Sequence, residues 1–249
     1  MTYRFAGSCS PLTSLKTAAL VLIGIVLGAG CIGQPAPEPA TPEPAASEGA
    51  SAAAWTDLTD PSHWRSYGGD AFPSGWAFED GALARTDSGD GGDIVTREVY
   101  GDFELMLEWK VEPCGNSGIF YRGAEGAEYV WNTAPEMQVL DNTCHPDAAT
   151  PAHTAGAVYA LYAPTEDVTR PAGEWNEVRI VADGAHVEHW LNGVKIAEYE
   201  QGSDDWNARV AASKFNAMPG FGTHSAGPIG LQDHGDLVWY RHIRIRPLS

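Results

Sequence analysis

The chain has 249 residues, of which 43% are hydrophobic, and a formal net charge of −18 at pH 7. This length leaves room for one or two domains with a sizeable core. A chain this acidic repels phosphate backbones, so we expect no nucleic-acid partner.

The N-terminus has the pattern of an export signal. Arg4 and Lys16 precede an apolar run over residues 18–29, which is too short to span a bilayer comfortably. The five residues that end at Cys31 resemble a bacterial lipoprotein cleavage box, in which the cysteine is lipidated and begins the mature chain. Gly28 departs from that box, where leucine is more usual. We expect a lipid anchor at Cys31, with plain secretion or an uncleaved anchor as the alternatives.

Composition divides the chain into three parts. Residues 1–30 are the expected signal peptide, and residues 31–54 combine the lipidated cysteine with a disordered linker of Pro, Ala, Glu and Ser. Residues 55–249 are the expected folded domain. This organisation predicts a lipoprotein of the bacterial cell envelope, outer-membrane or periplasmic, which reaches the membrane through its lipid anchor. That oxidising compartment favours a disulfide between Cys114 and Cys144, with two free buried thiols as the alternative.

The folded domain is predicted to be mostly β. Residues 103–111 place five apolar residues in strict alternation, the pattern of a strand with one buried face. Asn192-Gly193 separates two further strand patterns and suits a type I′ hairpin turn. Many short strands with turn residues between them indicate an all-β sandwich or jelly roll. In chain order the expected elements are strands at 94–98, 103–111, 118–121, within 134–142, 157–162, 178–181, 186–191, 194–199, 229–233 and 237–245, with a helical turn within 203–215.

The strand within residues 134–142 carries the most informative polar side chains. Side chains alternate along a strand, so Glu136 and Gln138 share one face while Met137 and Val139 take the other. Asp141 follows at the rim, where a turn begins. This surface would suit a polyhydroxylated ligand or a hard cation. The alternative is a solvated strand face with an ordinary turn aspartate.

Two other segments carry candidate ligand groups. Asn116 and Arg122 lie an even number of residues apart after the strongest strand, so they are expected to share a face as a ligand-facing amide and guanidinium. The alternative is a tight turn with an edge arginine. His145 and His153 bracket a loop, where an imidazole can act as a general acid or base or can simply be solvated.

The second polar strand end spans residues 229–236. Here Gln232 and His234 follow a buried strand, which repeats the pattern of Gln138 and Asp141. We expect the two strand ends to converge on one pocket, with an ordinary hairpin turn as the alternative. Lys214 is expected either to face that pocket or to cap the preceding turn.

Short segments in this order resemble the 3-keto-disaccharide hydrolase domain family, a bacterial group with a concanavalin- or LamG-like jelly-roll β-sandwich. The resemblance covers the chain from Trp55 to Leu248. The matching segments are 100–105 with 108–109, 116–119 with Arg122, 136–141, 156–159, 171–176, 189–193, 213–215 and 231–235.

The resemblance implies cleavage of glycosides already oxidised to a ketone at sugar carbon 3, downstream of a sugar 3-dehydrogenase. The ketone acidifies the proton on carbon 2. Its removal gives an enolate that expels the group on carbon 1, and water then completes a net hydrolysis. Such a route needs a base, an acid and an electrophile for the enolate oxygen.

The residues expected in these roles fall into three groups. The base, the acid and tentative metal ligands are Glu136, Asp141, and His153 or His234. The enolate is stabilised by Arg122, by Lys214 or by a divalent cation such as Ca²⁺, Mn²⁺ or Mg²⁺, which oxygen-rich ligands suit. The sugar hydroxyls are held by Asn116, Gln138, Tyr159 and Gln232.

Two competing functions remain at this stage. A non-catalytic carbohydrate-binding module would present an aromatic platform, for which Trp55, Trp64, Trp76 and Trp131 are the candidates. A tethered structural or adhesion domain would have no polar pocket, and Glu136 would lie far from His234.

Overall fold

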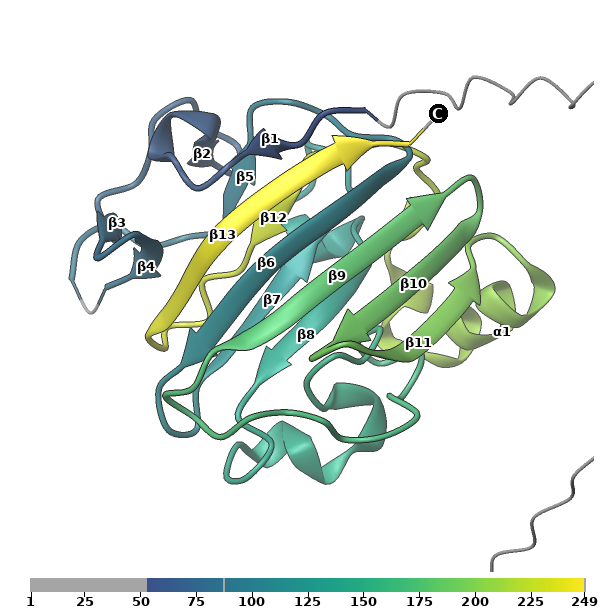
Figure 1. The fold of residues 1–249 in the computed structure, drawn as a ribbon. Helices are drawn as coiled ribbons and strands as arrows, with labels where there is room; N and C mark the ends of the chain where they lie inside the picture. The colour runs from purple at the N-terminus through teal and green to yellow at the C-terminus, as the bar shows by residue number, and fades with distance from the viewer. Residues whose placement is uncertain (1–52, 87, 249) are drawn as a thin grey trace, which may run out of the picture. The chain divides into compact units, whose positions relative to one another are not determined.

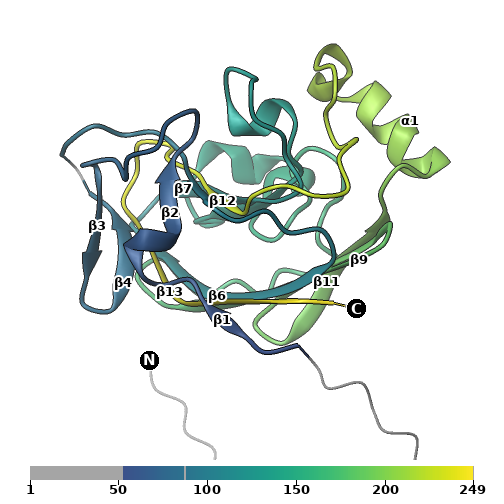
Figure 2. The ribbon, with the colours of Figure 1, turned by 90° about the horizontal axis from the view of Figure 1, so that it is seen from above.

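Two antiparallel sheets packed face to face form the folded part of the chain (Figures 1 and 2). The computed structural model describes residues 53–86 and 88–248. The expected signal peptide, Cys31 and nearly all of the expected linker lie outside the described residues. Among the described residues, no helix is both long and apolar enough to cross a membrane.

The larger sheet has the strand order β11-β10-β9-β6-β13-β4-β3, and β1 pairs with β13 at one end. Its strands are β1 (Thr56–Asp57), β3 (Trp76–Glu79), β4 (Ala82–Arg85), β6 (Phe103–Val111), β9 (Asn176–Asp183), β10 (His186–Leu191), β11 (Val194–Glu200) and β13 (Val238–Pro247).

The smaller sheet has the order β2-β5-β12-β7-β8. Its strands are β2 (Trp64–Ser66), β5 (Ile94–Thr96), β7 (Asn116–Phe120), β8 (Glu136–Leu140) and β12 (Gly230–Leu231). One α-helix is described, α1 (Asp204–Ala212), and the short 3-10 turns are η1 (Pro61–His63), η2 (Val130–Asn132), η3 (Pro146–Ala149), η4 (Pro151–His153) and η5 (Lys214–Ala217).

The main core lies between the two sheets. In β6 the alternation seen in the sequence sends Leu105, Leu107 and Trp109 into this core, where each is at most 1% exposed. Burying each such side chain stabilises the fold by about 1.5–3 kcal/mol. The predicted strand at 103–111 and the all-β sandwich are therefore both confirmed.

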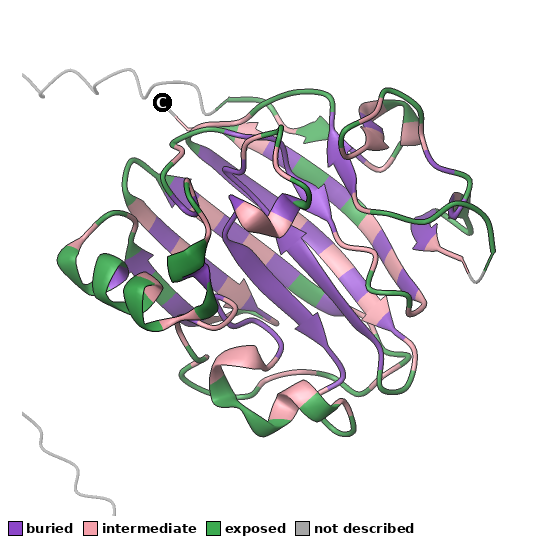
Figure 3. Ribbon diagram, turned by 180° about the vertical axis from the view of Figure 1, so that it is seen from behind, coloured by how far each residue is buried: buried purple, intermediate pink, exposed green. Residues whose placement is uncertain are grey.

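The central strands of the smaller sheet are buried on both faces. All residues of β7 and β8 are buried, so these strands appear as continuous purple arrows in Figure 3. Loops and 3-10 turns lie over the outer side of this sheet (Figure 2). Polar side chains on that outer face are therefore shielded by loops rather than by the opposite sheet.

Local turn chemistry explains one confirmed hairpin and one wrong strand. Asn192 and Gly193 both have positive φ, 49° and 84°, as a type I′ turn between β10 and β11 requires. The strand predicted at 157–162 is instead a closed turn, in which Val158 and Tyr162 bond to each other. Ala160 has φ of 58° there, which no strand allows.

The predicted helical turn within 203–215 is confirmed as α1, which Ser203 caps by accepting a hydrogen bond from the Trp206 amide. Two of the four tryptophans considered for an aromatic platform are unavailable to a ligand, while Trp131 is partly exposed. Trp64 and Trp76 are 0% and 3% exposed and belong to the core between the sheets, so neither can stack on a sugar.

Candidate active site

The outer face of the smaller sheet carries the candidate site. The side chains of Ser117 and Tyr121 point toward the larger sheet, where their hydroxyls form hydrogen bonds of 2.7 Å with Tyr240 and His189, respectively. Alternation along the strand then turns Asn116 and Gly118 to the outer face.

A pocket of about 210 Å³ opens on this outer face. The sheet supplies its floor, and the turns η2, η3 and η5 with the loop at Tyr159 supply its walls. It is lined by Asn116, Trp131, Glu136, Gln138, Asp147, Tyr159, Lys214, Gln232 and His234. The two glutamine-bearing strand ends thus meet at one pocket, and Glu136 and His234 line it together.

Gly118 makes the floor of this pocket possible. It pairs with Gln138 across the sheet, and its carbonyl accepts a 2.9 Å hydrogen bond from the backbone amide of Gln232. A Cβ atom on Gly118 would lie 2.1 Å from Glu136 Oε1. The Glu136 carboxyl therefore occupies the space above this glycine, with Gln138 and Gln232 beside it.

Glu136 is the most strongly perturbed carboxyl of the pocket. It is 6% exposed, and burial raises its pKa to about 8, against the opposing effect of the Lys214 charge. The negative charges of Asp93 and Asp147 raise it further. Glu136 is therefore mostly protonated at neutral pH and is able to donate a proton.

Lys214 is held between aromatic rings in the pocket wall. Its ammonium lies 4.4 Å from the ring centre of Tyr159 and 5.2 Å from that of Trp131. Partial burial lowers the pKa of Lys214, and the charges of Glu136 and Asp147 partly restore it. A cation in this low-dielectric wall is suited to stabilise an anionic oxygen in the pocket.

Two amide oxygens in the pocket have no hydrogen-bond partner among the described residues. These are Asn116 Oδ1 and Gln138 Oε1, whose side chains are 3% and 1% exposed. A buried polar atom without a partner costs about 1–3 kcal/mol. Hydroxyl groups of a ligand could donate hydrogen bonds to both oxygens. Buried amides with a purely structural role usually have such partners within the protein.

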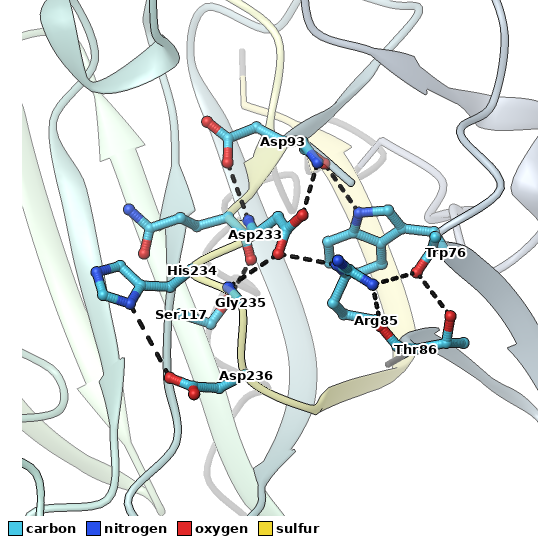
Figure 4. Close-up of polar contacts among 12 residues, drawn as sticks. Trp76, Arg85, Thr86, Asp93, Ser117, Asp233, His234, Gly235 and Asp236 are labelled. Carbon is cyan, nitrogen blue, oxygen red and sulfur yellow. Dashed lines mark hydrogen bonds and ion pairs between the residues drawn. The ribbon is translucent and has the colours of Figure 1, made fainter. Parts of the chain in front are cut away.

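The turn after β12 is tied firmly to the strands around it. Ser117 Oγ donates to the backbone carbonyl of Gln232 at 2.6 Å, and the backbone amide of Asn116 donates to the Asp236 carboxylate at 3.0 Å. Asp233 forms an ion pair with Arg85 at 2.8 Å, on the side away from His234 (Figure 4). These contacts fix Gln232 and leave the imidazole of His234, half exposed, at the edge of the pocket.

Asp141 does not line the pocket. One of its oxygens accepts hydrogen bonds from the amide and hydroxyl of Thr143, and the other accepts from the Cys114 amide at 2.9 Å. Cys144 is joined to Cys114 by a disulfide, with a Cα–Cα distance of 5.1 Å, so the expected pairing is present. These contacts give Asp141 a structural place at the turn.

Arg122 also lies away from this pocket. The strand ends at Phe120, and Arg122 has φ of 51°, so the even spacing from Asn116 no longer places both on one face. Its guanidinium instead bonds to Asp102 at 2.9 Å and to Gln201 at 3.1 Å. It borders a different cavity, of about 670 Å³, beside α1.

His153 stands behind the pocket wall rather than in it. Its ring stacks on Tyr159 with centres 4.6 Å apart. Tyr159 is thus the pocket residue, and His153 supports its ring.

The tentative metal site at Glu136 and Asp141 does not assemble among the described residues. The oxygens of Asp141 already accept hydrogen bonds at the turn, and Glu136 shares its pocket with the Lys214 ammonium. The described residues that could share an ion are His186, Glu188 and Glu198 on the hairpin of β10 and β11. There the Lys195 ammonium already lies 3.2 Å from Glu188.

Sequence reasoning missed Asp147 as a site residue. It lies in η3, between the two loop histidines, and no strand periodicity places it near the pocket. Gly118 was likewise missed as the residue that makes room for Glu136. A glycine inside a strand is the signal that would have indicated a close approach of another group to the backbone at this position.

Comparison with known proteins identifies the relatives of this chain. A 3-keto-disaccharide hydrolase of Bacteroides thetaiotaomicron is 36% identical over 216 residues, covering 75% of this chain and 74% of the relative. A putative glycosyl hydrolase of Parabacteroides distasonis has a crystal structure with a TM-score of 0.72 and 33% identity, covering 78% of this chain and 94% of that one.

A more distant structure supports the fold alone. A Bacillus subtilis protein with a galectin-like fold matches with a TM-score of 0.52 at 14% identity, covering 79% of this chain and 96% of that one. This likeness agrees with the predicted jelly-roll class of sandwich.

The family model described as a 3-keto-alpha-glucoside-1,2-lyase-like domain matches residues 54–246, and the chain belongs to that family.

Proposed function

We propose that this protein cleaves the glycosidic bond of 3-keto-glycosides, including 3-keto-disaccharides, by elimination followed by addition of water. The family and the 36% identical hydrolase support the substrate class. The observation that carries the proposal is the pocket itself, which combines a protonated carboxyl at Glu136, a cation at Lys214 and two unpartnered amide oxygens.

The size of the pocket supports recognition of one sugar ring. Its volume of about 210 Å³ is below the range of roughly 300–1,000 Å³ that encloses drug-sized ligands. A single keto-sugar would fill it, while the leaving group would extend outside. Asn116, Gln138, Gln232 and Tyr159 are then placed to hold the hydroxyls of the oxidised ring.

Lys214 and Glu136 match the two charges that develop during the elimination. Proton loss at carbon 2 sends negative charge to the carbon 3 oxygen, which the Lys214 ammonium would stabilise. Expulsion of the leaving group creates an alkoxide, which the Glu136 carboxyl would protonate. A pair of carboxylates at the spacing of a simple glycosidase is not needed, because no oxocarbenium ion forms.

The test is incubation with a panel of 3-keto-glycosides and their unoxidised parents, with and without a chelator. We expect release of the leaving group only from the oxidised compounds, and the chelator tests whether turnover depends on a divalent cation. Nuclear magnetic resonance spectra would reveal the unsaturated intermediate. Binding of unoxidised glycans without turnover of any keto compound would instead support the carbohydrate-binding alternative.

The cellular setting is proposed on the sequence. We propose a lipoprotein anchored through Cys31 on the envelope of a bacterium, outer-membrane or periplasmic. Because the ketone at carbon 3 has to be made by oxidation of a hydroxyl, a sugar 3-dehydrogenase must act first. Metabolic labelling with a palmitate analogue, compared between the protein and its Cys31→Ser variant, tests the anchor.

A further inference from the structure

The pocket contains two carboxyl groups in very different surroundings. Glu136 lies on the sheet, is 6% exposed, and is mostly protonated at neutral pH. Asp147 lies in η3 on the loop wall and is only partly buried. Two carboxyl groups in unlike environments are suited to divide the acid and base roles of one reaction.

Asp147 is fixed in place by its neighbours. The His145 side chain caps η3 by accepting the Asp147 amide hydrogen at 3.2 Å, and the disulfide at Cys144 anchors the preceding turn. Tyr159 Oη lies 3.5 Å from Asp147 Oδ2, and the Lys214 ammonium lies over the same tyrosine ring at 4.4 Å. Asp147, Tyr159 and Lys214 thus form one constellation on the pocket wall.

We propose that Asp147 is the carboxylate that removes the carbon 2 proton, while Glu136 gives its proton to the leaving-group oxygen. This inference rests on the proposed function and assigns the base that the elimination needs. Tyr159 would hold the Asp147 carboxylate in place, and Lys214 would lie close to the oxygen that becomes negative.

The protons balance over the whole reaction. Asp147 takes the hydrogen from carbon 2, and the electron pair of that bond moves through the enolate to break the bond between carbon 1 and the leaving oxygen. That oxygen receives the Glu136 proton. In the second half, Glu136 takes a proton from the water that adds to carbon 1, and Asp147 returns its proton to carbon 2.

The chain offers a matched control for Asp147. On α1, Asp205 accepts a 2.8 Å hydrogen bond from the Tyr162 hydroxyl, and Arg209 lies over the Tyr162 ring at 4.2 Å. This is the same set of aspartate, tyrosine and cation, but none of its members lines the pocket. A change to Asp205 therefore disturbs the same kind of contact without touching the proposed chemistry.

The first experiment compares Asp147→Asn with Asp205→Asn. General base catalysis contributes about 10²–10⁴-fold, so we expect Asp147→Asn to lower kcat/KM on a 3-keto-disaccharide by at least about 10². Asp205→Asn should retain the wild-type rate. Thermal unfolding of both variants checks that they are folded. A folded Asp147→Asn variant with the wild-type rate would overturn the inference.

The second experiment separates the base from the acid. A 4-nitrophenyl 3-keto-glucoside has a leaving group that departs without a proton, so the loss caused by Glu136→Gln should shrink at least about tenfold relative to a 3-keto-disaccharide. The loss caused by Asp147→Asn should be the same on both compounds, because the carbon 2 proton must still be removed. The reverse pattern would make Asp147 the acid and refute the assignment.

The same measurements separate this inference from the proposed function. Wild-type protein that cleaves no 3-keto compound would overturn the proposed function, and the assignment of Asp147 would fall with it. Active wild-type protein with an equally active Asp147→Asn variant would overturn only the assignment. As a further check, formate should restore turnover to Asp147→Ala, since a free carboxylate can then enter the space left by the side chain.

Discussion

Replacing Gly118 with alanine should disable the pocket without removing any polar side chain. The new Cβ would lie 2.1 Å from Glu136 Oε1, 2.7 Å from Cδ and 2.9 Å from Cγ. To reach an ordinary contact of 3.4 Å, the carboxyl oxygen must move by about 1.3 Å. A displacement of about 1 Å in a reacting group can cost about 10²-fold in rate, so we expect a loss of that size in kcat/KM.

The same contact should also lower stability. Overpacking of a buried site costs about 1–3 kcal/mol, and in a domain of this size each kcal/mol shifts Tm by about 2–4 °C. Gly69→Ala is the matched control, because its Cβ would meet nothing closer than Ser66 Cβ at 3.5 Å. Kinetics on a 3-keto-disaccharide and thermal unfolding of both variants measure the two effects.

A double-mutant cycle shows whether the loss passes through Glu136. Asp lacks one methylene, so Glu136→Asp withdraws the carboxyl from the space above Gly118. We expect the two changes to be less than additive, since the shorter side chain relieves the clash. Wild-type activity in Gly118→Ala, or full additivity in the double variant, would refute the view that this glycine holds the Glu136 carboxyl in place.

Three further outcomes are expected. Lys214→Ala should lower kcat by about 10²–10³ with little change in Tm, because it removes a charge that stabilises the enolate, and steady-state kinetics checks this. Folding raises the pKa of Glu136 from 4.5 to about 8. Between these two pH values the unfolded chain binds fewer protons than the folded protein, so the free energy of unfolding should fall as pH rises from 4.5 to about 8. Glu136→Gln should flatten this dependence, which unfolding measured across the same pH range would reveal. Replacing Cys114 and Cys144 with serine should cost about 2–5 kcal/mol, measured by denaturant unfolding, because the disulfide closes a loop with a sequence separation of 30.

Strands with one buried face were the part of the fold that the sequence predicted well. In β6 each second side chain enters the core, so the burial pattern repeats every two residues as the apolar pattern does, whereas in β13 a register shift between Arg241 and Arg244 interrupts this period. The turn at Asn192 was equally readable, since positive φ at two successive positions selects few residue types. In these cases local chemistry and tertiary packing impose the same pattern.

The short strands near the N-terminus were not predicted. β2, β3 and β4 have three or four residues each, which is too few for a period of two to be recognised, and glycines and prolines interrupt the segments between them. β2 pairs with β5 and β4 pairs with β13, both far away in sequence, whereas β3 pairs only with its neighbour β4 across the turn at Asp80 and Gly81. For β2 and β4, the assembled sheets supply the pairing that periodicity within the strand does not reveal.

The candidate site was predictable where it follows strand ends. Gln138 and Gln232 were chosen because each is an amide close to the end of a buried strand, and both line the pocket. The depth of the pocket depends instead on the order of β12, β7 and β8, which places Gly118 between them. Strand order is a long-range property, so the pattern within one strand does not reveal it.

Two aspartates six residues apart illustrate the same difference. Asp141 directly follows a strand and was expected in the pocket, yet its oxygens hold the turn by accepting from Cys114 and Thr143. That anchored turn, locked by the disulfide, sets the course of the loop that brings Asp147 to the pocket wall. Asp141 therefore affects the site only by positioning the loop that carries Asp147. Asp141→Asn should lower activity only to the extent that it loosens this loop.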